Sequence, residues 1–68
     1  MGWEIVNTEN LRREIIGRAI TRNPNDPEQY EVRSIKSNGY ITAVMVTDMA
    51  KLKMIPEEKL IKEKWWIK

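Results

Sequence analysis

Residues 30–47 read YEVRSIKSNGYITAVMVT, with the dipeptide Asn38-Gly39 at their centre. Asn-Gly between alternating apolar residues is the strongest short-range signal for a β-hairpin, because a type I′ turn needs positive φ at both central positions. A turn of this type places Met45 opposite Val32. We therefore expect two antiparallel strands around this turn. The apolar side chains on one face of the hairpin are then Tyr30, Val32, Ile41, Ala43 and Met45.

The chain after this hairpin predicts a second turn, a third strand and a short helix. Asp48-Met49-Ala50 suits a turn, and residues 51–55 alternate Lys with apolar side chains before Pro56 stops the strand. Pro56 also suits the start of a helical turn over residues 56–61, where acidic residues follow at the positive end of the helix dipole. Residues 65–67 are typical of a short closing strand. We expect three methionines of this region to fill the core: Met45, Met49 and Met54.

The first third of the chain allows two interpretations. Thr8-Glu9-Asn10 can cap a helix, and apolar residues over 11–20 recur at helical spacing. Gly17 and the β-branched residues beside it favour a strand instead. We expect one or two helical turns from Thr8 and then a strand over residues 15–22, which leads into a loop at Asn23-Pro24-Asn25-Asp26-Pro27.

The order of these elements resembles that of the small SH3-like barrels. Over residues 15–68 it runs strand, long loop, strand, tight turn, strand, turn, strand, helical turn and short strand. The resemblance implies a mostly β fold, a barrel of about five short strands with a helical turn near residues 56–61. The N-terminal helix would precede it. The first strand lacks the aromatic run with which SH3 domains grip proline-rich peptides, so we do not carry that ligand over. The alternative is an α+β fold, in which a long N-terminal helix packs on a three-stranded antiparallel meander.

The 68-residue chain contains no His and no Cys. These two side chains most often provide metal ligands, nucleophiles and acid–base groups that titrate near neutral pH. Ser34 and Ser37 therefore have no His to activate them, and Glu57-Glu58 is better explained as charge that complements a helix N-terminus. We expect one small domain over residues 1–68, with no catalytic activity, no cofactor and no bound metal.

Trp65-Trp66 is the most informative pair for binding. Neighbouring residues of a strand face opposite ways, so one Trp can enter the core while the other meets a partner. Arg22 and Arg33 flank the proline loop and can present guanidinium groups to phosphate or carboxylate. Ordinary solvated surface charge is the competing interpretation of these arginines. The predicted partner-binding residues are Trp65, Trp66, Lys62, Lys64, Lys68, Tyr40, Arg22 and Arg33.

The net charge of +2, with acidic and basic residues interleaved, favours a protein-interaction module of adaptor or inhibitor type. Its partner would be another protein or a second copy of the chain. The alternative is a nucleic-acid-binding barrel that uses the Lys-rich C-terminal third and stacks bases on Trp and Tyr. We infer no small-molecule substrate and no membrane span, since no stretch is long and apolar enough to cross a bilayer. The first residues lack the basic leader of a signal peptide, so the expected location is the cytoplasm.

Overall fold

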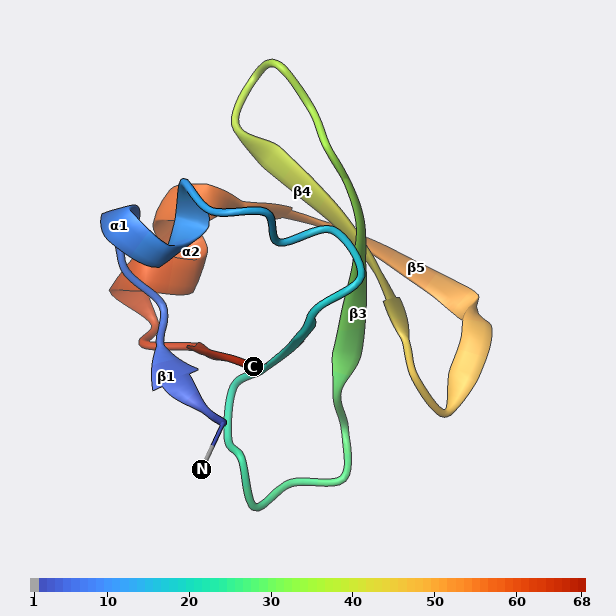
Figure 1. The fold of residues 1–68 in the computed structure, drawn as a ribbon. Helices are drawn as coiled ribbons and strands as arrows, with labels where there is room; N and C mark the ends of the chain where they lie inside the picture. Colours follow the sequence, from blue (N-terminus) through green and yellow to red (C-terminus); the bar gives the residue numbers. More distant parts are fainter. Residues whose placement is uncertain (1) are drawn as a thin grey trace.

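The computed structural model describes residues 2–68 and confirms a mostly β fold. Strands dominate the centre of the chain, and both helices are short (Figure 1). The elements in chain order are β1 (Glu4–Ile5), α1 (Thr8–Leu11), β2 (Ala19–Thr21), β3 (Tyr30–Ile35), β4 (Tyr40–Met45), β5 (Asp48–Pro56), α2 (Glu57–Lys62) and β6 (Trp66–Ile67).

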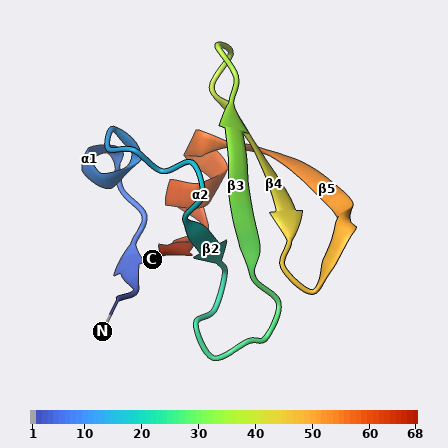
Figure 2. The same cartoon turned by 45° about the vertical axis from the view of Figure 1, so that its right-hand side comes forward.

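The strands form one six-stranded antiparallel sheet in the order β1-β6-β2-β3-β4-β5. This order leaves β1 and β5 as the two edges, so the sheet is open and the expected barrel closure is not shown. Strands β3, β4 and β5 lie on one side of the molecule, and β1 lies with both helices on the other side (Figure 1; Figure 2).

The hairpin at Asn38-Gly39 is confirmed, but its turn type and its register differ from the expectation. Lys36 N donates to Tyr40 O at 2.7 Å, so the turn has three residues, of which Gly39 alone has a positive φ, 85°. A bulge in β3 between Val32 and Ser34 then adds a second one-residue offset. Val32 consequently lies opposite Ala43 rather than Met45. Beyond the bulge the shift is two residues, so Tyr30 and Val32 keep their predicted face, because side chains alternate with a period of two. Between the turn and the bulge the shift is one residue, so Ile35 lies opposite Ile41.

The second turn was placed wrongly. Met45 pairs with Asp48, so the chain reverses at Val46-Thr47, and Asp48-Met49-Ala50 begins β5 instead. Met45 packs against the core as expected. Met49 and Met54 are 52% and 56% exposed, so their predicted role as core residues is wrong. Both lie in an edge strand, where no further strand covers them.

The N-terminal helix is short because it is capped early and then interrupted. Asn7 and Asn10 form a capping box, in which each side chain accepts a hydrogen bond from the other residue's backbone N–H, at 2.9 and 3.0 Å. Gly17 adopts φ 90°, which a helix cannot accommodate, and its N–H donates to Val32 O at 2.8 Å. The long-helix alternative is therefore wrong. The expected strand over residues 15–22 is reduced to β2, because residues 15–18 form a turn.

The helical turn near residues 56–61 is confirmed as α2, and its end determines where the C-terminal tryptophans lie. Lys64 adopts a left-handed φ of 57°; its N–H donates to Ile61 O at 3.2 Å, and Trp65 N donates to Leu60 O at 2.9 Å. This pair of bonds is the Schellman arrangement that closes many helices. It directs Trp65 into the core beside Leu60, and the predicted closing strand follows as β6.

The core lies between the sheet and the two helices. Val6, Leu11 and Ile15 reach it from the N-terminal segment, and Leu60 reaches it from α2. Within residues 2–68 neither helix has the length and apolar character that crossing a bilayer requires. The remaining core residues come mainly from the strands: Ile20, Tyr30, Val32, Ile41, Ala43, Ile55, Trp65 and Ile67.

Candidate functional site

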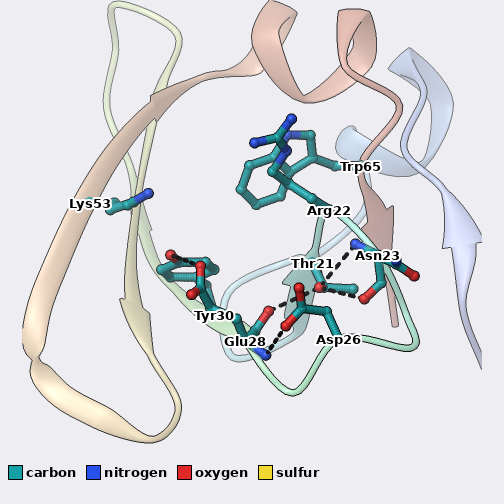
Figure 3. Close-up of a pocket in the computed structure, with 8 residues that line it drawn as sticks. All are labelled: Thr21, Arg22, Asn23, Asp26, Glu28, Tyr30, Lys53 and Trp65. Atoms are coloured by element: carbon teal, nitrogen blue, oxygen red, sulfur yellow. Dashed lines mark hydrogen bonds between the residues drawn. The ribbon is translucent and has the colours of Figure 1, made fainter.

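A cavity of about 360 Å³ lies where the loop between β2 and β3 faces β5 and the end of α2. Figure 3 shows its side chains arranged around a common space, with Lys53 reaching toward it from β5. The volume falls within the range of small-ligand sites. The lining residues are Thr21, Arg22, Asn23, Asp26, Glu28, Tyr30, Lys53 and Trp65.

Two aromatic side chains, Tyr30 and Trp65, form the apolar part of the cavity wall. Their ring centroids lie 6.1 Å apart with an interplanar angle of 47°, and each residue is only 3% exposed. Each polar tip has a carboxylate partner: Tyr30 Oη donates to Glu28 Oε1 at 3.1 Å, and Trp65 Nε1 donates to Glu63 Oε1 at 3.0 Å. Buried aromatic rings whose polar ends are satisfied are held in place. This wall is therefore preformed.

The loop over the cavity is held by its own side chains. Thr21 Oγ1 accepts from Asn23 N at 3.3 Å and lies 3.0 Å from Glu28 O, to which it can donate. Asp26 Oδ1 accepts from Glu28 N at 2.9 Å, which is a typical Asx-turn contact. The two prolines of the loop restrict it further. These contacts fix where the Asp26 and Glu28 carboxylates stand.

Charges of both signs surround the aromatic wall. Lys53 Nζ lies 5.3 Å from the centroid of the Tyr30 ring, a cation–π contact that contributes about 0.5–1 kcal/mol at an exposed site. Arg22 Nε lies 3.8 Å from Glu63 Oε1. The hydrogen bond from Trp65 lowers the pKa of Glu63 below its ordinary value of 4.5; Lys59 and Arg22 lower the pKa further, while burial opposes them. Glu63 therefore stays ionised and neutralises Arg22.

The structure does not gather the predicted partner-binding residues into one site. Trp65 and Arg22 line the cavity, but Trp65 is buried rather than exposed, and Trp66 is the half-buried member of the pair. Arg33 pairs with Glu31 at 3.4 Å, so the two arginines have separate carboxylate partners. The others lie elsewhere on the surface: Lys62 and Lys64 at the end of α2, Tyr40 at the start of β4, and Lys68 with Nζ 5.4 Å from the centroid of the Trp3 ring.

Sequence reasoning missed most of the cavity. Tyr30 was placed on the apolar face of the hairpin, Asp26 in the proline loop and Lys53 in the third predicted strand, and the structure agrees with each placement. Their convergence depends on how β3, β5 and the proline loop pack together, which no local motif encodes. The Asn/Pro composition of residues 23–27 was the one available signal, since ordered polar loops often carry binding residues.

A second candidate site is the side of the β4–β5 hairpin that faces away from the core. Side chains alternate along a strand, so Ile41 and Ala43 enter the core and their neighbours point to the opposite side. Leu52 and Met54 are 58% and 56% exposed there. We call this surface the outer face, and it consists of Thr42, Val44, Leu52 and Met54.

Thr42 on the outer face has an unusual environment. The residue is 8% exposed, and its hydroxyl has no hydrogen-bond partner within residues 2–68. A buried hydroxyl without a partner costs about 1–3 kcal/mol. The outer face thus combines exposed apolar side chains with one polar group that folding leaves unsatisfied.

No protein-family model, curated protein or solved structure matches this chain. Across residues 2–68, no group of three or more carboxylates is close enough together to hold a metal ion.

Proposed function

We propose that this chain is a non-catalytic protein-interaction module, of adaptor or inhibitor type, that binds a protein partner through the outer face. The observation that carries the proposal is the concentration of exposed apolar side chains on the β4–β5 hairpin. Exposed apolar patches are typical of interaction sites. Leu52 and Met54 lie on the outer face itself and are 58% and 56% exposed. Five of the eight large apolar residues exposed within residues 2–68 belong to residues 40–56: Tyr40, Val46, Met49, Leu52 and Met54.

The excess of positive charge in residues 33–56 supports a partner with acidic flanks. This stretch contains a single carboxylate, Asp48, and the neighbouring Glu31, which lies opposite Val44 on the outer face, is paired with Arg33 at 3.4 Å. A partner segment with apolar side chains between Asp or Glu residues complements both the exposed apolar side chains and the positive charge of this region. The cationic residues of residues 33–56 are Arg33, Lys36, Lys51 and Lys53, of which Lys53 lies opposite Ala43 on the inner face and lines the cavity.

Selection from a peptide display library on the immobilised chain tests this proposal. We expect the selected peptides to carry apolar residues beside Asp or Glu. Leu52→Glu should weaken a selected peptide by about tenfold or more, because burying a Leu contributes roughly 1.5–3 kcal/mol and the new carboxylate repels the peptide. The matched control is Ile16→Glu, at a residue that is 52% exposed and lies outside the outer face. It should change affinity less than twofold.

Equal losses in the two variants, or selected peptides without apolar residues, would contradict the proposal. Sedimentation of the chain alone tests whether a second copy of the chain occupies the outer face instead. If Leu52→Glu converts a dimer to a monomer, the occupant is a second copy. Binding of single-stranded oligonucleotides that weakens with salt, by about 0.7 log units per log salt for each phosphate contact, would replace this proposal with the nucleic-acid alternative. That alternative has less support, because Trp65 is buried and is not free to stack on a base.

We propose an SH3-like arrangement of the strands and a cytoplasmic location together with this function. An SH3-like arrangement of β2 to β6 is supported by the position of α2 directly before the last strand and by the lengths of the connecting turns. Pairing of β5 with β1 would be needed to close it. A cytoplasmic location is the corresponding proposal for where the module acts.

A further inference from the structure

We propose that the cavity binds an alkylammonium group, of the kind carried by a trimethylated lysine side chain or by choline, and that Lys53 occupies this site in the free protein. The proposal does not depend on the outer face, because the cavity and the outer face lie on opposite sides of the β4–β5 hairpin.

The aromatic wall already holds a cation. Lys53 Nζ lies 5.3 Å from the Tyr30 ring centroid, within the distance at which a ring face attracts an ammonium group. Tyr30 and Trp65 stand at 47° to each other, so a rounded cation can contact both rings. Methylated ammonium groups suit such surfaces better than a primary ammonium, because their apolar methyl groups cover the rings and they lose less hydration on entering.

The remaining charges favour a cation once Lys53 withdraws. The Arg22 guanidinium is balanced by Glu63 at 3.8 Å. Asp26 and Glu28 each use one carboxylate oxygen for a local hydrogen bond: Asp26 Oδ1 accepts from Glu28 N, and Glu28 Oε1 accepts from Tyr30 Oη. The vacated cavity is then bordered by two unneutralised carboxylates beside two aromatic rings, which is an environment for a positive group.

Lys53 is suited to act as a displaceable occupant. It belongs to the edge strand β5 and is an exposed residue, so its long side chain can leave without disturbing the core. The wall and the loop remain in place through the bonds of Thr21, Asp26 and Glu63 described above. Binding of an external alkylammonium therefore exchanges one cation for another on a preformed surface, and Lys53 reduces the apparent affinity.

A titration followed by NMR tests this site, with the indole N–H of Trp65 as the reporter. We expect choline to shift the Trp65 signal saturably. Its uncharged isostere 3,3-dimethyl-1-butanol, which has the same shape, should not. A trimethyllysine peptide and free choline distinguish the source of the group: the tighter of the two shows whether a protein side chain or a small molecule is the ligand.

Substitutions in and beside the cavity test the role of each charged residue in choline binding. Lys53→Met keeps the length of the side chain and removes the competing ammonium, so choline should bind about two- to fivefold more tightly. Lys51→Met is the matched control in the same strand and should leave the affinity unchanged. Asp26→Asn keeps the oxygen that accepts from Glu28 N but removes the charge, and it should weaken binding about threefold or more. The dispersed NMR spectrum of each variant confirms that it is folded.

Three results would overturn the proposal. One is an equal response to choline and to dimethylbutanol, which would make the cavity simply apolar. Another is a saturable shift with inorganic phosphate, which would make it an anion site of Arg22 and Lys53. The last is the absence of a saturable choline shift in Lys53→Met up to about 100 mM, since at that concentration even very weak sites fill.

Discussion

The inner and outer faces of the β4–β5 hairpin are built from alternating residues of the same two strands, yet on the outer face only the β4 residues Thr42 and Val44 are buried. Ile41 and Ala43 are completely buried, whereas Leu52 and Met54 are more than half exposed. The inner face packs on the helices and β2, and it also carries Lys53 toward the cavity. The difference shows that folding buries one apolar set completely and leaves part of the other in contact with solvent.

The largest expected difference between the faces is in the free energy of unfolding after truncation to Ala. Ile41→Ala should lose about 2–5 kcal/mol, because it leaves a cavity in a small core, whereas Leu52→Ala should change stability by less than about 0.5 kcal/mol. Urea denaturation measures both. If Ile41→Ala does not fold, Ile41→Val should still lose about 0.5–1.5 kcal/mol. A comparable loss for Leu52→Ala would mean that the outer face is already covered, for example by a second copy.

Two buried threonines extend the comparison to polar groups. Thr21 is completely buried beside the cavity and hydrogen-bonds the loop, while the Thr42 hydroxyl on the outer face has no partner in residues 2–68. Thr21→Val should lose about 1–3 kcal/mol, and Thr42→Val should be neutral or stabilising, because only the first removes a made hydrogen bond. Thermal or urea unfolding of the pair checks this. A clear loss for Thr42→Val would show that its hydroxyl is satisfied in solution.

At the end of α2, where the chain directs Trp65 into the core, substitution by Gly should have opposite effects on stability at two nearby positions. Lys64 adopts φ 57°, so Lys64→Gly should relieve the left-handed strain and stabilise the fold by about 1 kcal/mol. The same change two residues earlier, Lys62→Gly in α2, should destabilise by about 1 kcal/mol, since Gly is a poor helix residue. The denaturant midpoints of the two variants measure both effects. If both substitutions stabilise or both destabilise the fold, α2 does not end with a left-handed residue at Lys64.

The smallest expected effect is the pH dependence contributed by Glu63. Its pKa is lowered in the folded chain, so its contribution to stability is complete above its ordinary value of 4.5 and is lost as the pH falls below 4.5 toward the folded pKa. Glu63→Gln keeps an acceptor for the Trp65 indole and lacks this titration. The stability difference between wild type and variant should therefore shrink on acidification from pH 7 to pH 3. A constant difference would contradict the assignment.

Much of the β structure was predictable because its signals are local. Gly39 reverses the chain as expected, Pro56 ends β5, and Asn23 to Pro27 form a loop. Register was predicted less well, because a third turn residue and the β3 bulge each add an offset that alternation alone does not reveal. The candidate site was predicted least well. Sequence left open which of Trp65 and Trp66 is buried, and Trp65 proves to form the buried wall of a cavity whose other residues were assigned separately.

The sequence by itself determined the positions of the turns, the β character and the short caps, because these depend on the φ preferences of one or two residues and on apolar alternation. Only the tertiary structure decided which Trp is buried, that Leu52 and Met54 stay exposed, and that Lys53 lies over Tyr30. The physical reason is that each of these depends on packing between segments far apart in the chain. Which strands pair, and where the sheet ends, is a property of the whole fold and of no single stretch of it.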